Sequence, residues 1–152
     1  GAGTSPHVTL AMIEELSEMG FGGFASSYGI HNNIIAPYLS RHGTEEQKMH
    51  WLPRMAKGEV VGALAMTEPG AGSDVQGIRT NAVRDGDEWV ISGQKVWNSG
   101  AQSADYGILL ARTDFAAAKH QGISFFLLPM RQSAVEVRPL HQMNGHSGML
   151  TS

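Results

Sequence analysis

The chain has 152 residues, a net charge of −3 at neutral pH and a hydrophobic fraction of 41%. These values fit a globular protein with a packed core, and the lack of a basic run argues against nucleic acid or an anionic membrane surface as a partner. The sequence holds no cysteine, which excludes disulfides, thiolate metal sites and a cysteine nucleophile. No apolar run has the length of a membrane span.

The first part of the chain is predicted to be helical. Ser5 followed by Pro6 is typical of a helix start, and Gly20 is typical of the end of that helix. Aromatic and aliphatic residues spaced three or four apart predict a second helix over 24–38. Because proline lacks an N–H and crowds the preceding turn, we expect a kink at Pro37.

A third helix is predicted to follow Gly43, which stops the second. Thr44 and Gln47 form the pattern of a capping box, and the helix should run to about Pro53. The pattern then changes after Gly58, where short aliphatic runs replace helical spacing. We therefore expect a helical domain over 1–58 and a β domain over 59–152, with the β domain incomplete.

Six short aliphatic runs predict strands, separated by Gly, Asp, Asn and Pro: 59–66, 80–84, 88–94, 106–112, 123–128 and 135–140. Asp85 and Gly86 are expected in the turn of a hairpin. Runs with hairpin-like spacing and no helix between them indicate an antiparallel sheet or barrel. The predicted fold class is α+β, with helices first and an antiparallel β domain second.

The stretch AMTEPGAGSDV, residues 65–75, is the first candidate site. Gly70 and Gly72 allow backbone conformations and close approach that a side chain would block, and Ser73 with Asp74 could present donors to a phosphate, thioester or ring carbonyl. A surface turn capped by Asp74 explains the same residues. Glu68 could be a general base, but a carboxylate before proline at a turn favours a structural role.

The stretch GQKVWNSGAQSADY, residues 93–106, is the second candidate site. The indole of Trp97 could stack on a planar ligand and Ser99 could donate to a heteroatom of its ring. A half-buried strand tryptophan followed by a polar turn is the alternative. His141 and His146 have no third ligand at a useful spacing, so no metal site is expected.

The order and spacing of several motifs resemble the acyl-CoA dehydrogenase family. They are GALAMTEPGAGSDVQGIRTNA, ISGQKVWNSGAQSADYGILLARTD and GISFFLLP, preceded by HNNIIAPYLSRHGTEEQKMHWLPRMAKGE. The resemblance runs from about Val8 to Gly148. It implies an enzyme of helical, β and helical domains that uses FAD to oxidise the Cα–Cβ bond of an acyl-CoA thioester. This chain would hold the end of the N-terminal helical domain and the middle β domain, with the C-terminal helical domain absent.

The same resemblance implies roles for individual residues. Leu64, Met66 and Thr67 would lie along the flavin, with the Thr67 hydroxyl bonding its pyrimidine edge. Trp97 would stand beside the flavin ring, and Ser99 would donate near the flavin N5.

Acyl-CoA would enter past Gly72 and Ser73, and Ser73 would bond to its thioester-linked arm. The family's catalytic base is a glutamate of the C-terminal helical domain, so no catalytic residue is named in this chain.

The segment WNSG replaces the commoner WITN of the family. The change from Thr to Ser keeps a hydroxyl donor.

The resemblance also implies partners: acyl-CoA, an electron-transferring flavoprotein, and further subunits in a homo- or hetero-oligomer. Bacterial cytoplasm fits these expectations, as does the mitochondrial matrix for a eukaryotic source. An alternative function is a truncated or partner subunit that keeps the β fold as a non-catalytic binding module. An oxidase with the same architecture, which would pass electrons to O₂, is a further alternative.

Overall fold

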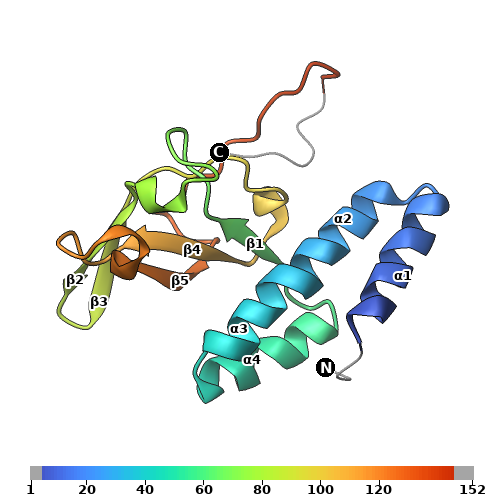
Figure 1. The fold of residues 1–152 in the computed structure, drawn as a ribbon, viewed down its shortest axis with the longest axis horizontal. Coiled ribbons are helices and arrows are strands. Elements are labelled where there is room, and N and C mark those ends of the chain that lie inside the picture. The colour runs from blue at the N-terminus through green and yellow to red at the C-terminus, as the bar shows by residue number, and fades with distance from the viewer. Residues whose placement is uncertain (1–4, 146–152) are drawn as a thin grey trace. The chain divides into compact units, whose positions relative to one another are not determined.

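The chain divides into two compact units between Val61 and Gly62. The computed structural model describes residues 5–145. Helices make up the first unit and a sheet forms the second (Figure 1). This order confirms the predicted fold class, a helical part followed by a β part. The predicted boundary at Gly58 lies slightly earlier in the chain.

Four α-helices lie in the described part of the first unit, residues 5–61. They are α1 (Pro6–Glu18), α2 (Gly22–Ile30), α3 (Ala36–His42) and α4 (Glu45–Ala56). Helix α1 lies beside α2, and α3 packs against α4 (Figure 1). Among residues 5–145, no helix combines the length and the apolar character needed to cross a bilayer.

The irregularity predicted at Pro37 takes the form of a π-helical turn over His31–Ile35, directly before α3. The N–H of Ala36 donates to the carbonyl of His31, five residues back. The wider turn follows from the proline, because its ring excludes the carbonyl four residues earlier and it has no N–H to donate.

The predicted capping box is present at the start of α4. Thr44 Oγ1 accepts from the Gln47 N–H at 3.2 Å, and Gln47 Oε1 accepts from the Thr44 N–H at 2.9 Å. The predicted end at Pro53 is wrong, since α4 continues to Ala56. Proline removes only its own hydrogen bond to Met49, and the Pro53 carbonyl still accepts from the N–H of Lys57 at 3.3 Å.

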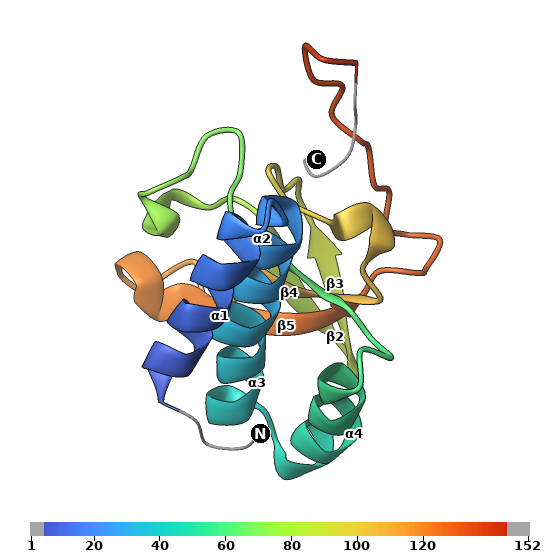
Figure 2. The ribbon, with the colours of Figure 1, turned by 90° about the vertical axis from the view of Figure 1, so that its right-hand side faces the viewer.

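In the second unit, five strands form the sheet within residues 62–145. They are β1 (Gly62–Ala65), β2 (Asn81–Asp85), β3 (Glu88–Ser92), β4 (Tyr106–Arg112) and β5 (Ile123–Pro129). Their order is β1-β4-β2-β3. Strand β5 pairs with β4 and lies beside it in Figure 2. Strand β4 is the centre of the core, because the side chains of Tyr106 and Ile108 are fully buried.

The sheet is mixed, so the expectation of purely antiparallel pairing is wrong. Strand β4 is parallel to both β1 and β2, while the pairs β2–β3 and β4–β5 are antiparallel. Parallel pairing of β1 with β4 is possible because the long segment 66–105 returns the chain to the same end of the sheet. The spacing of the strands along the sequence does not predict this crossover connection.

The structure also corrects the predicted hairpin turn and the predicted last strand. The turn of the β2–β3 hairpin is Gly86–Asp87, one residue later than expected, and Gly86 takes the positive φ of 60° that the first position of a type II′ turn requires. The predicted strand over 135–140 is not formed; within it only Pro139 makes an isolated β-bridge. Proline cannot donate to a strand ladder, which explains why this apolar run does not extend the sheet.

Candidate functional site

Two segments of the chain leave the sheet side by side and carry the predicted flavin residues. Strand β1 continues into residues 66–68, and strand β3 continues into residues 93–99. The N–H of Val96 donates to the carbonyl of Thr67 at 2.9 Å. This hydrogen bond places Thr67 next to the segment that holds Trp97 and Ser99, although thirty residues separate them in sequence.

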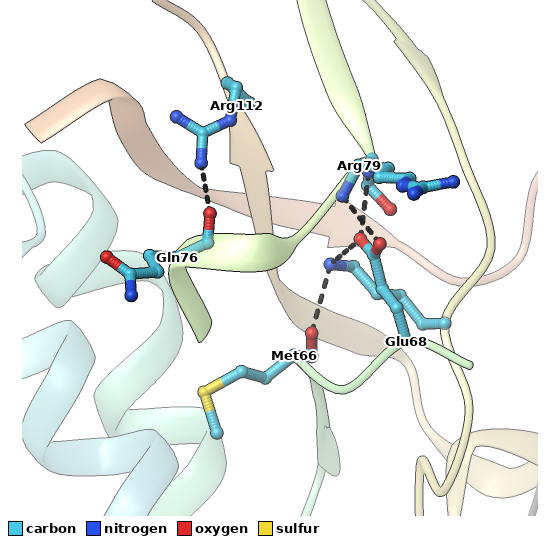
Figure 3. A network of polar contacts seen from close by, with 7 residues as sticks. Met66, Glu68, Gln76, Arg79 and Arg112 are labelled. Atoms are coloured by element: carbon cyan, nitrogen blue, oxygen red, sulfur yellow. Dashed lines mark hydrogen bonds and ion pairs between the residues drawn. The ribbon is translucent and has the colours of Figure 1, made fainter. Parts of the chain in front are cut away.

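A buried ion pair joins the same two segments. Lys95 Nζ donates to Glu68 Oε1 at 2.8 Å and to the carbonyl of Met66 at 3.1 Å. The Glu68 carboxylate also accepts from the backbone N–H groups of Arg79 at 2.7 Å and Thr80 at 2.9 Å (Figure 3). Glu68 and Lys95 expose only 7% and 8% of their surfaces. One carboxylate therefore ties three separate stretches of chain together.

Burial disfavours the charged form of both residues, but the net pKa shifts of Glu68 and Lys95 have different main causes. Burial alone would raise the pKa of Glu68, but hydrogen bonds from Arg79, Lys95 and Thr80 outweigh it and lower the pKa to about 2. Burial lowers the pKa of Lys95, and the bond to Glu68 only partly opposes this. Glu68 is therefore ionised at neutral pH with its oxygens occupied by donors. This geometry supports the structural role of Glu68 and not that of a general base.

Of the five predicted flavin residues, Leu64 lies within β1 and the other four follow the ends of β1 and β3. Leu64, Met66 and Thr67 are half-buried, and Ser99 is half-buried as well. Trp97 exposes 59% of its surface and has a φ of 61°, a left-handed conformation that is strained for a large side chain. Among residues 5–145, the hydroxyls of Thr67 and Ser99 make no hydrogen bond. Their donors are available to a ligand.

The loop that holds the predicted substrate residues is exposed. Gly72 and Ser73 are both exposed, and a Cβ added at Gly70 or Gly72 would meet no atom within 4 Å. Neither glycine has a positive φ, so the backbone of the turn does not itself need glycine at these positions. The predicted side-chain cap at Asp74 is also not formed. The fold leaves the space at Gly72 empty, which is room that a ligand could use.

Sequence reasoning missed the residues that hold this loop. Lys95 stands in a strand-like polar run where a lysine normally faces solvent, so no local pattern signals its burial. Gly93 is required for a different reason: a Cβ there would overlap Thr80 Oγ1 and lie 2.6 Å from Thr80 Cα. The N–H of Thr80 donates to Glu68, so Gly93 permits the close approach of the two segments that the ion pair joins.

A cavity of about 510 Å³ lies in the second unit beside the candidate site, and Lys95 is among the residues that line it. Apolar side chains of the sheet line one side, among them Ile91, Leu109 and Leu128, and the segment 134–138 lines another. None of the seven predicted flavin and substrate residues lines it. The cavity therefore borders the candidate site without including those seven residues.

No group of three or more His, Asp or Glu side chains within residues 5–145 could hold a metal ion. His141 is exposed, and His146 lies outside the described residues.

Comparison with known families accounts for both units. The model for "Acyl-CoA dehydrogenase, middle domain" matches residues 63–152, and that for "Acyl-CoA dehydrogenase, N-terminal domain" matches residues 1–59. The chain belongs to the acyl-CoA dehydrogenase family. Its two compact units correspond to the N-terminal and middle domains of that family.

Two curated relatives illustrate the match. The chain is 40% identical over 151 residues to acyl-CoA dehydrogenase FadE34 of Mycobacterium tuberculosis, covering 97% of this chain and 20% of that protein. It is 42% identical over 118 residues to the mitochondrial long-chain specific acyl-CoA dehydrogenase of Sus scrofa, covering 76% and 27%. The chain thus spans about a quarter or less of the length of these relatives.

Solved structures of family members are similar throughout the chain. An acyl-CoA dehydrogenase from Geobacillus kaustophilus superposes with a TM-score of 0.88 at 35% identity, covering 99% of this chain and 40% of that one. A glutaryl-CoA dehydrogenase from Mycobacterium smegmatis, in complex with FADH2, gives 0.80 at 34% identity, with 94% and 35% covered. The ChsE4-ChsE5 complex from Mycobacterium tuberculosis gives 0.82 at 37% identity, with 99% and 39% covered.

The buried ion pair predicts a strong energetic coupling. Either Glu68→Gln or Lys95→Met alone should lower the free energy of unfolding by about 3 kcal/mol, because each leaves a buried charge without its partner. The double variant should lose much less than the sum of the two. Urea unfolding of the four proteins measures the coupling.

The exposed pair Glu45–Lys48 is the matched control, since its atoms are also 2.8 Å apart but Glu45 exposes 85% of its side chain. Its coupling should stay below about 1 kcal/mol. Equal couplings for the two pairs would contradict the importance assigned to burial.

The lowered pKa of Glu68 predicts a loss of stability in acid. The folded-state value of about 2 lies below the ordinary 4.5, so the contribution of this carboxylate is complete above pH 4.5 and is lost as the pH falls toward 2. Unfolding free energies of wild type and Glu68→Gln, measured from pH 6 to pH 3, should therefore converge. Parallel curves would show that Glu68 titrates normally in the folded protein.

Proposed function

We propose that this chain is the flavin- and substrate-facing part of an FAD-dependent acyl-CoA dehydrogenase that oxidises the Cα–Cβ bond of an acyl-CoA thioester to give enoyl-CoA. The observation that carries this proposal is the pairing of the two strand ends. It brings the segment of Thr67 next to the segment that holds Ser99 and the exposed indole of Trp97, and neither hydroxyl is bonded within residues 5–145. Two O–H donors beside a planar ring suit the polar edge and face of an isoalloxazine.

In this proposal each residue has a stated task toward FAD, which when bound supplies the acceptor for the electrons removed from the substrate. The Thr67 hydroxyl would donate to the pyrimidine edge, and Ser99 would donate near N5. Leu64, Met66 and Trp97 would contact the ring. Donors that are held in place before the reaction stabilise developing negative charge without reorganisation.

The loop beyond β1 meets the substrate in this proposal. The empty space at Gly72 lets the narrow pantetheine arm of acyl-CoA pass close to the backbone, and Ser73 donates to that arm. Glu68 is not the base that removes the α-proton, because its oxygens already accept from Lys95, Arg79 and Thr80. We name no catalytic base within residues 5–145.

Partners and compartment follow from the same proposal. Electrons would pass to an electron-transferring flavoprotein, and further subunits would complete a homo- or hetero-oligomer. The ChsE4-ChsE5 complex, a solved relative formed from two named components, supports hetero-oligomers as one route. Bacterial cytoplasm or mitochondrial matrix are the proposed locations, since the relatives include a mycobacterial protein and a mitochondrial one.

A visible spectrum of the complete gene product, purified with added FAD and titrated anaerobically with acyl-CoA thioesters, tests the function. A bound flavin band that bleaches on substrate is the expected result. Bound flavin that no acyl-CoA bleaches would favour a non-catalytic binding module. A complete lack of flavin binding would contradict the proposal.

The variant Trp97→Gly should weaken FAD binding while leaving the free energy of unfolding nearly unchanged. Loss of the indole should weaken FAD binding by about tenfold, since aromatic contact contributes roughly 1–2 kcal/mol. The free energy of unfolding without FAD should change by less than about 0.5 kcal/mol, because glycine relieves the left-handed strain while adding backbone entropy. Fluorescence titration with FAD and urea unfolding measure the two effects.

Trp97→Phe is the control that keeps an aromatic ring at the same backbone position. It should retain most of the FAD affinity. An unchanged FAD affinity in Trp97→Gly would contradict the proposed contact between Trp97 and the flavin.

A further inference from the structure

Arg112 ends the central strand β4, and its side chain bonds to backbone only. Its Nη2 donates to the carbonyl of Gln76 at 2.6 Å (Figure 3). Its Nη1 donates to the carbonyl of Lys119 at 3.2 Å. No carboxylate among residues 5–145 pairs with the half-buried guanidinium. A charged donor bound to neutral carbonyls at such short range forms strong hydrogen bonds.

Gln76 belongs to a 3₁₀ turn, Val75–Gly77, that closes the far side of the loop holding Gly72 and Ser73. The near side of that loop is held by Glu68, which bonds to the N–H of Thr80. Thr80 in turn accepts from the Arg112 N–H at 2.8 Å. The Arg112 side chain therefore bonds to one end of the loop, while its backbone bonds to Thr80, which contacts Glu68 at the other end.

The surroundings leave room for this guanidinium. Gly122 lies against it, and a Cβ added there would sit 3.2 Å from Arg112 Nη1 and overlap the carbonyl of Asp114. Lys119, whose carbonyl accepts from Nη1, has a φ of 53°, so the second acceptor is itself held in a strained conformation. Between the two attachment points Ala71 is buried and exchanges two backbone hydrogen bonds with Glu68, whereas Gly70, Gly72 and Ser73 are exposed.

We propose that Arg112 is a positioning residue that sets the place of the Gly72–Ser73 loop, and through it the binding of acyl-CoA. The inference rests on the proposed function for its substrate, but the anchoring of the loop does not depend on it. Arg112 touches neither substrate nor flavin in this account. It acts through the Gln76 carbonyl, at the end of the loop opposite the Glu68–Lys95 pair.

The first arm of the test measures loop order without substrate. Amide hydrogen exchange of residues 70–77 is compared in the complete gene product and in Arg112→Ala. Loss of a charge-assisted hydrogen bond should speed exchange there by about tenfold or more, while amides of β4 keep their protection. Unchanged exchange at 70–77 in the folded variant would overturn the proposal.

Arg84→Ala is the matched control, because Arg84 Nε also donates to a backbone carbonyl, that of Gly86 at 3.0 Å, but in the β2–β3 hairpin. It should leave exchange at 70–77 unchanged. If Arg112→Ala does not fold, Arg112→Lys replaces it. One ammonium cannot reproduce the fork that reaches both carbonyls, so the loop should still be released.

The second arm measures kinetics with acyl-CoA. Arg112→Ala should raise KM by about tenfold and change kcat by less than about twofold, because ground-state placement of the substrate is what the loop controls. Ethylguanidinium added to Arg112→Ala should restore part of the affinity. A released loop with an unchanged KM would overturn the link to substrate binding. If wild type binds neither FAD nor acyl-CoA, the proposed function fails, and the exchange result alone decides whether Arg112 anchors the loop.

Discussion

The buried contact between Glu68 and Lys95 is the constraint on which the candidate site depends. Taking two charges out of water is costly, and their attraction offsets this only when the remaining polar atoms are satisfied. Glu68 meets that condition because two backbone N–H groups share its carboxylate with Lys95. Lys95 also bonds to the Met66 carbonyl. The pair thus fixes the relative position of two segments that an apolar contact of the same size would allow to slide.

The strained backbone at Trp97 is a consequence of this fixation. A left-handed conformation of a large residue persists only where the neighbours determine it. Val96 is held by the Thr67 carbonyl on one side, and the Ser99 N–H donates to the Trp97 carbonyl at 3.0 Å on the other. The indole is thereby directed outward, with more than half of its surface exposed. The same hydrogen bonds therefore hold the backbone around Trp97 and leave its indole exposed.

Local features of the fold were predictable from the sequence, and distant pairings were not. The capping box at Thr44 and the irregularity at Pro37 depend on residues within one turn, so short patterns were sufficient. The parallel pairing of β1 with β4 depends on how the intervening segment 66–105 crosses over, which strand spacing does not encode. The failed strand over 135–140 shows the limit of apolar patterning, because Pro139 interrupts the ladder there.

The same distinction applies to the candidate site. Motif resemblance placed Thr67, Trp97 and Ser99 in one functional set before any geometry was known, and the structure brings their segments together. The residues that hold these segments, Lys95 and Arg112, were missed because a charged side chain in a strand normally faces water. Burial of a charge is decided by which distant backbone groups meet it, so only the tertiary structure reveals it.

The arrangement separates the residues that hold the loop from those that would contact a ligand. Glu68, Lys95 and Arg112 bind mainly to backbone N–H and carbonyl groups, which every residue type supplies. Their bonds therefore place few demands on the side chains of the loop between them. Gly72 and Ser73 make no packing contribution that the fold requires, so their identities are free to follow the chemistry of whatever binds there. A loop of low intrinsic stability can in this way keep a defined position, because its two ends are attached to the buried part of the sheet.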